Sequence, residues 1–149
     1  MKLRIGSFVL LLCIAVGVGC RKKSSHQDVS KFDGEWAVVQ LLEKGRALDT
    51  QALKRLNITI AQGKLQKVEV DDTRLISAEE SAIQLDPTKS PAEIDLVCMQ
   101  GDNLGKARPG IFSLDGDTLQ ICIGEIGSPR PTDFVAGTNV SLIQLERKK

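Results

Sequence analysis

The sequence predicts an all-β protein, an antiparallel up-and-down barrel of about eight strands with one short helix after the first strand. Short apolar runs of strand length recur at even intervals from Trp36 to Leu145, and turn residues separate them. The core must be built mainly from Ile, Leu and Val, because the chain has one Trp, four Phe and no Tyr. Successive runs are joined without long crossovers, which favours a meander that closes on itself.

The N-terminus has the pattern of an export signal. A basic start at residues 1–4 is followed by a short apolar run at 5–18 and by small residues before Cys20. The apolar run is too short for a comfortable membrane-spanning helix. We therefore expect a signal peptide at 1–19 and a barrel domain at 31–149.

Residues 17–20, Gly-Val-Gly-Cys, resemble a bacterial lipobox, in which the cysteine is lipidated and becomes the mature N-terminus. The first position departs from the usual Leu. Acyl chains on Cys20 would hold the protein on a membrane, with burial worth about 0.8 kcal/mol per CH₂. A polar tether is then expected at 20–30, with the domain exported to the periplasmic side of the inner or outer membrane. The alternative is an ordinary secretory signal that leaves Cys20 as a plain thiol.

The first strand of the domain is expected at 37–42, with apolar residues on both faces. A short helix at 49–56 follows, and Asp49 or Thr50 can cap it. Two prolines in 86–91 indicate a turn, since proline cannot donate to a strand ladder. The remaining strands are expected at 57–61, 65–70, 81–85, 92–99, 110–114, 117–123 and 139–145, with loops at 100–109 and 124–131.

The clearest element is the hairpin at 110–123. Asp115 and Gly116 both adopt positive φ readily, as the loop of a two-residue type I′ turn requires. With that loop, Leu114 pairs with Asp117. The alternation then places four apolar side chains on one face: Phe112, Leu114, Leu119 and Ile121.

Several motifs between residues 31 and 147 carry a resemblance. They are Gly-Glu-Trp at 34–36, Leu-Asp-Pro-Thr-Lys-Ser-Pro at 85–91, Ile-Asp-Leu at 94–96, Gly-Ile-Phe at 110–112, Leu-Asp-Gly-Asp-Thr-Leu at 114–119 with Cys122, and Arg-Pro-Thr-Asp-Phe at 130–134. Together they resemble an uncharacterised lipocalin-like domain family that is abundant in planctomycete bacteria. Phe112 is a departure, because the family usually has Tyr there. The resemblance implies the barrel fold but no established activity, so no catalytic or binding residue is carried over.

Gly34 and Trp36 are also similar to the Gly-x-Trp motif that opens lipocalins. In lipocalins the tryptophan closes one end of the barrel beneath an arginine from the far end of the chain. The resemblance implies that Arg147 stacks on Trp36, with Arg130 as the second choice, and such stacking is worth about 0.5–2 kcal/mol. The alternative is that Trp36 is simply the largest core residue.

The sequence argues against an enzyme. His26 is the only histidine and lies in the expected tether, so a Ser-His-Asp site, a Cys-His site or a histidine-ligated zinc site has no base or ligand in the domain. Asp115 and Asp117 lack the ligand series of an EF-hand and are better explained by a turn. We expect no cofactor and no metal. The formal net charge of +1 gives no basic surface for nucleic acid.

Cys98 and Cys122 could form a disulfide in an oxidising compartment, but their expected places in the sheet argue against it. Cys122 lies on the face opposite Ile121, whereas Cys98 shares the face of Leu96. The strand at 110–114 also separates them by about two strand spacings of 4.7–4.9 Å. We expect both thiols to be free.

Two functions remain open. The first is a membrane-tethered binding protein that holds a small apolar or amphipathic ligand, since an eight-stranded barrel has room for one small ligand or for its own side chains. Arg108 and Arg130, each followed by proline, could receive an anionic head group if their loops share one barrel mouth. The second is a barrel filled by residues such as Leu96 and Phe112 that serves as an interaction module of the cell envelope. On the outer face, Asp95 could pair with a basic residue.

Overall fold

The computed structural model describes residues 29–72 and 74–149. These residues form the strands β1 (Gly34–Glu43), β2 (Arg46–Ala47), β3 (Leu56–Ala61), β4 (Lys64–Asp71), β5 (Arg74–Asp86), β6 (Ala92–Cys98), β7 (Ala107–Asp115), β8 (Thr118–Gly124) and β9 (Val140–Arg147). One α-helix, α2 (Thr50–Lys54), lies between β2 and β3. Two 3₁₀ helices, η1 (Ser30–Phe32) and η2 (Gly101–Asn103), complete the described elements.

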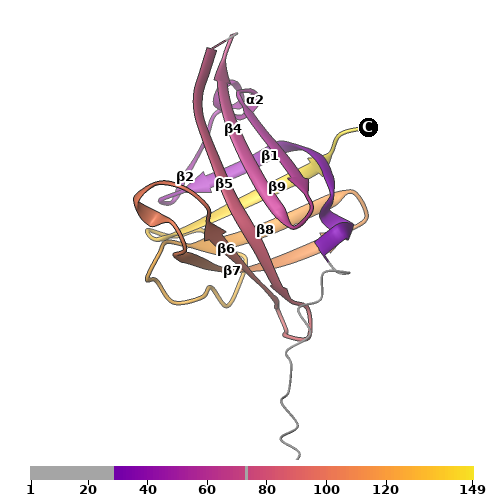
Figure 1. Ribbon diagram of the computed structural model, residues 1–149, viewed down its shortest axis with the longest axis vertical. Helices are drawn as coiled ribbons and strands as arrows, with labels where there is room; N and C mark the ends of the chain where they lie inside the picture. The colour runs from indigo at the N-terminus through magenta and orange to yellow at the C-terminus, as the bar shows by residue number, and fades with distance from the viewer. Residues whose placement is uncertain (1–28, 73) are drawn as a thin grey trace, which may run out of the picture.

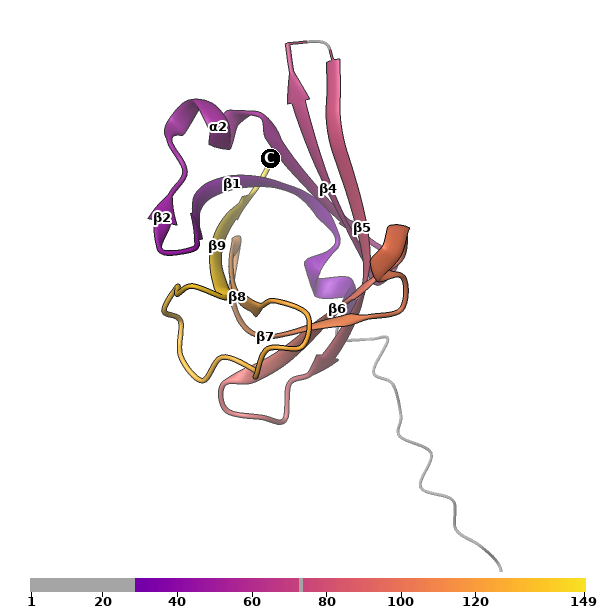
Figure 2. The ribbon, with the colours of Figure 1, turned by 90° about the vertical axis from the view of Figure 1, so that its left-hand side faces the viewer.

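Eight of these strands close into an antiparallel barrel. The order is β1-β3-β4-β5-β6-β7-β8-β9, and β1 returns to pair with β9 from Trp36 opposite Arg147 to Leu42 opposite Leu142. β2 only extends β1 by a two-residue pairing. Figure 2 shows the curved sheet, with β1, β9, β8, β7 and β6 around η1. The prediction of an eight-stranded up-and-down barrel with one short helix is confirmed.

The main core lies inside the barrel and is almost entirely aliphatic. Its most buried side chains are Trp36, Phe32, Ile60, Ile94, Leu119, Ile121, Ile123 and Leu145. Directly opposed residues share a face, and pairs such as Val38 with Leu145 carry the inward side from strand to strand. No polar or charged side chain is fully buried in the part of the chain that the structure describes.

A second apolar cluster lies on the outer face of β7, β8 and β9. Its buried members are Ile111, Cys122 and Leu142. Phe134 and Ala136, from the loop at 125–139, pack against them. Figure 2 shows this long loop running outside the barrel beside β8 and β7. Apolar side chains on both faces of β8 are therefore explained by the loop that covers its outer side.

Individual residues explain where α2 begins and how the chain turns between β3 and β4. Asp49 caps α2, and its side chain accepts a hydrogen bond from the N–H of Ala52 at 2.9 Å. The turn between β3 and β4 is Gln62-Gly63, whose φ values are 52° and 75°. Two positive φ values are typical of a type I′ hairpin turn, which suits the twist of the flanking strands.

The hairpin of β7 and β8 is present, but its turn lies one residue further along the chain than predicted. Asp115 pairs with Thr118, and Leu114 pairs with Leu119 rather than with Asp117. The loop is therefore Gly116-Asp117, and of these two only Gly116 has positive φ, at 56°. That pattern is typical of a type II′ turn, which needs glycine at its first central position. The partners move by two positions, so the predicted faces are unchanged.

β5 is longer than the sequence indicated, since it runs from Arg74 rather than from residue 81. Its first half breaks the alternation, because Ile76 has no partner on β4 at an irregularity in the register. Figure 1 shows β4 and β5 extending well beyond the other strands of the barrel. The tip carries two exposed apolar side chains, Leu75 and Ile76.

Candidate ligand-binding site

One end of the barrel is closed by Trp36 and Arg147. Trp36 has no exposed surface, and its Nε1 donates a hydrogen bond to the carbonyl oxygen of Phe32 at 2.8 Å. The guanidinium carbon of Arg147 lies 4.3 Å from the centre of the Trp36 ring, so the stacking that the sequence predicted is present. Phe32 in turn makes an edge contact with Phe112, at 5.3 Å between ring centres.

Arg147 also fastens the chain that precedes β1. Its Nη1 donates to the carbonyl oxygen of Asp33, and its Nη2 donates to that of Lys31 at 2.8 Å. Its Nε lies 3.3 Å from a carboxylate oxygen of Asp117 in the β7–β8 turn. At Gly34, whose φ is 142°, a Cβ would lie only 2.7 Å from Nη1. Glycine at this position therefore gives the guanidinium the space that it occupies.

A cavity of about 50 Å³ lies inside the barrel, towards the end opposite Trp36. Its wall is aliphatic and comes from β1, β3, β4, β6, β8 and β9, with Ile58, Leu96 and Ile121 among its members. Its polar lining comes from the ends of β1, β7 and β9 and from the middle of β4 and β5: Glu43, Lys67, Glu79, Ser81, Arg108 and Ser141. We call these six residues the rim.

The rim carries two cations and two anions. Lys67 and Glu79 are directly opposed on β4 and β5, and they form an ion pair at 3.2 Å. Glu43 is exposed at the end of β1. Arg108 is half-buried, and its Nε donates to the carbonyl oxygen of Gly124 at 3.2 Å. Among the residues that the structure describes, no carboxylate lies within 4.0 Å of the Arg108 guanidinium.

The small cavity volume limits what the barrel can hold. Ligand pockets for drug-sized molecules span roughly 300–1,000 Å³, whereas this cavity measures about 50 Å³. One water-sized group needs roughly 10–15 Å³ on this scale, so the cavity has room for about four such groups. Most of the interior is filled by the protein's own side chains.

A wider and more open cleft, of about 350 Å³, lies near the closed end. It runs between η1, the turn after β5, and β7, where β6 begins at Ala92 and leaves part of β7 without a partner on that side. Phe32, Pro87 and Phe112 are among its lining residues. Unlike the cavity inside the barrel, it is an open surface feature.

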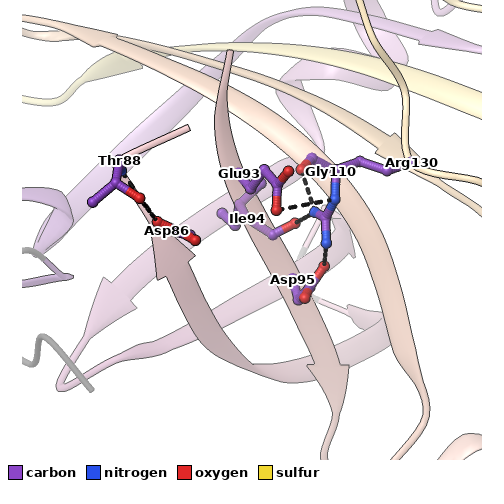
Figure 3. Close-up of polar contacts among 7 residues, drawn as sticks. All are labelled: Asp86, Thr88, Glu93, Ile94, Asp95, Gly110 and Arg130. Atoms are coloured by element: carbon purple, nitrogen blue, oxygen red, sulfur yellow. Dashed lines mark hydrogen bonds and ion pairs between the residues drawn. The ribbon is translucent and has the colours of Figure 1, made fainter. Parts of the chain in front are cut away.

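Arg130 does not belong to the rim. Figure 3 shows its guanidinium beside β6, where Nη2 lies 2.8 Å from Oδ1 of Asp95 and Nε lies 3.4 Å from a carboxylate oxygen of Glu93. Its Nη1 donates to the carbonyl oxygens of Ile94 and Gly110, at 3.1 Å and 2.6 Å. Asp95 is therefore paired with a basic residue as predicted, but the partner comes from the loop at 125–139 and not from across the sheet. Asp95 Oδ1 is buried and accepts no well-aligned hydrogen bond, so this ion pair is what offsets its loss of water.

Arg108 and Arg130 thus lie on opposite faces of the sheet. Arg108 is directly opposed to Leu96, which is buried in the inner core, whereas Arg130 contacts the outward residues Glu93 and Asp95. The two side chains therefore do not form one anion site, although the start of β7 and the loop at 125–139, which follows β8, lie at the same end of the barrel. The sequence placed Arg108 in a loop because proline follows it, but β7 begins at Ala107 and includes both residues.

The two described cysteines are free, as expected. Cys98 shares the inward face of Leu96, while Cys122 points outward under the loop at 125–139. The Cys122 thiol donates to the carbonyl oxygen of Val135 at 3.7 Å. Burial raises the pKa of the Cys122 thiol above its usual value, and the nearby charge of Asp133 acts in the same direction. The thiol is therefore protonated and unreactive near neutral pH.

Four further residues were singled out from the sequence, and the structure describes two of them. Asp115 and Gly116 lie at the end of β7 and in the hairpin loop, while Cys20 and His26 lie outside the described residues. Within the described residues, no three side chains of His, Cys, Asp or Glu lie close enough to hold a metal ion. None of the helices placed there is long and apolar enough to cross a membrane.

Sequence reasoning named only Arg108 of the six rim residues and missed the others: Glu43, Lys67, Glu79, Ser81 and Ser141. The available signal was a charged residue at an inward position of an otherwise apolar alternation, as at Lys67 after Leu65. Comparison with known proteins gives no further guide, because no family model, no curated protein and no solved structure matches this chain.

Proposed function

We propose that this protein is an exported, membrane-tethered binding protein that takes the end of one slender aliphatic ligand into its barrel. The observation that carries the proposal is the aliphatic cavity bordered by the polar rim, inside a barrel whose other end is closed by Trp36 and Arg147. An apolar wall with a few polar groups on one side is typical of small-molecule sites. The resemblance to a lipocalin-like family supports the same proposal by analogy of fold.

The small volume of the cavity defines the ligand. With room for about four methylene-sized groups, the barrel takes a short tail and leaves the head group at the rim. The same small volume favours a second function, in which the filled barrel is an interaction module of the cell envelope and binds no ligand.

The proposed tether is residues 20–30, with lipid on Cys20 after removal of a signal peptide at 1–19. The described chain begins at Val29, which is buried beside Gly63 in the β3–β4 turn. This turn and η1 lie at the closed end of the barrel, since Ile60 is directly opposed to Gly34. A tether that leaves from this end turns the rim away from the membrane.

Replacing Cys20 tests the tether. In a bacterial host fed radiolabelled palmitate, the full chain should be labelled and recovered with the membranes, because acylated cysteine is the proposed anchor. Cys20→Ala should be unlabelled and soluble, whereas the control Cys98→Ala should behave as the unmodified chain does. Recovery of the unmodified chain in the soluble fraction would contradict the anchor.

Titration with hexan-1-ol tests the cavity. Isothermal titration calorimetry of the full chain should show saturable binding of this neutral ligand, because the end of its tail can fill the cavity. Val38→Phe adds a ring to the cavity wall and should abolish the binding. The matched control is Val39→Phe on the same strand, where the side chain is 39 % exposed, and it should bind as before. Absence of binding to the unmodified chain would favour the filled module.

A further inference from the structure

We infer that the ligand is an amphipathic anion and that Arg108 binds its head group at the rim. This inference rests on the proposed function, because it names the chemical class of the ligand that the cavity takes. It depends on the direction in which Arg108 points, on the partners that its guanidinium lacks, and on the partners that the other charged rim residues have.

Arg108 points to the inside of the barrel. It is directly opposed to Leu96 on β6, and Leu96 is 5 % exposed within the inner core. Directly opposed residues of an antiparallel pair share a face. Arg108 and Leu96 accordingly line the same cavity, together with Ile121 and Ile123 of β8. A cation thus lies next to an aliphatic wall, which is the arrangement that an amphipathic anion requires.

The guanidinium of Arg108 has an open position for an anion. Its Nε is held by the carbonyl oxygen of Gly124 at 3.2 Å, and its Nη atoms have no hydrogen-bond partner among the described residues. The other half-buried arginines of the described chain, Arg130 and Arg147, each have a carboxylate within 3.4 Å as well as two backbone carbonyl oxygens. A half-buried cation without a counter-ion gains most from an added anion.

Of the charged rim residues, Arg108 is the one suited to bind an anionic head group. Lys67 is paired with Glu79 at 3.2 Å, so its charge is already compensated. Neither Glu79 nor the exposed Glu43 lies within 4.0 Å of the Arg108 guanidinium. The Nη edge of a guanidinium fits a carboxylate through two parallel hydrogen bonds, a geometry that an ammonium group lacks. The chemical class that fits is an anionic head group, such as a carboxylate, on a short aliphatic tail.

Calorimetric titration of the full chain with three ligands that each contain six carbon atoms tests the inference. Hexanoate should bind at least about ten-fold more tightly than hexan-1-ol, and hexylammonium should bind most weakly. In Arg108→Gln, the affinity for hexanoate should fall at least about ten-fold, while the affinity for hexan-1-ol should fall much less. The control Arg74→Gln removes an exposed arginine of β5 and should change neither affinity.

Tail length gives an independent readout. Along the series from butanoate to octanoate, the affinity should rise about four-fold for each methylene that enters the cavity. It should level off once the cavity is full, at about pentanoate, whose tail has about four carbon atoms. Added salt should weaken the binding of hexanoate but not that of hexan-1-ol, because only the former depends on charge.

The outcomes separate the two proposals. Equal affinities of the unmodified chain for hexanoate and hexan-1-ol would overturn the inference and leave the proposed function in place. Failure of both ligands to bind would overturn the proposed function. Arg108→Lys guards against a folding defect, since it keeps the charge and should bind hexanoate more weakly than the unmodified chain but more tightly than Arg108→Gln. An equal loss for both ligands in Arg108→Gln would overturn the role of Arg108.

Discussion

Trp36→Ala should lower the free energy of unfolding by about 3–5 kcal/mol. The indole is fully buried, and its removal leaves a cavity where η1 closes the barrel. It also removes the ring on which Arg147 stacks and the hydrogen bond to the carbonyl oxygen of Phe32. Urea denaturation followed by far-ultraviolet circular dichroism measures the effect. Fluorescence does not serve here, because Trp36 is the only tryptophan.

The matched control is Trp36→Phe, which keeps an aromatic ring under Arg147 but loses the N–H donor. It should cost about 1–2 kcal/mol, chiefly through the lost hydrogen bond and the smaller ring. A change of less than about 1 kcal/mol in Trp36→Ala would contradict the role of Trp36 in closing the barrel.

Arg130→Gln should lower the free energy of unfolding by about 2–3 kcal/mol. The change leaves the carboxylates of Glu93 and Asp95, which are about 30 % exposed, close together without their cation. Removing one partner of a buried ion pair costs about 3–5 kcal/mol, and partial exposure to water reduces that figure here. Urea denaturation measures the loss in stability.

A local readout follows from the loop at 125–139, which Arg130 fastens to β6 and β7 and which covers Cys122. In Arg130→Gln, a thiol reagent should modify Cys122 faster than in the unmodified chain, with the site of modification identified by mass spectrometry. The control is Arg55→Gln, whose ion pair with Asp71 is about half exposed on both sides and is worth about 0–1 kcal/mol. Equal Cys122 reactivity in both variants would contradict the fastening role.

The period-two patterning of this chain was enough to predict the barrel, because inward aliphatic residues alternate with outward polar ones along most strands. The pattern also placed Cys98 inside and Cys122 outside without any knowledge of the turn. It did not give the turn itself, because Asp115-Gly116 and Gly116-Asp117 both suit a tight turn and leave the faces unchanged. Only the cross-strand pairing decides between them.

The site was harder to predict for three physical reasons. The inward positions of β5 at the rim, Glu79 and Ser81, are polar. The alternation of apolar and polar residues that indicates a strand is therefore missing there. Proline after Arg108 suggests a loop, yet Pro109 lies just before the β7–β8 pairing starts at Gly110, where it removes no bond to β8. The partners of Arg130 lie 20 or more residues away along the chain, so no local pattern indicates them.

The pairing of β1 with β9 has a consequence for how the protein is made. Trp36 meets Arg147, so the first barrel strand acquires its second neighbour only after the ribosome has synthesised the last one. Bringing chain segments so far apart together costs on the order of 4 kcal/mol in entropy, and contacts of this range slow folding. A nascent polypeptide of this design therefore closes its barrel only after β9 has been synthesised.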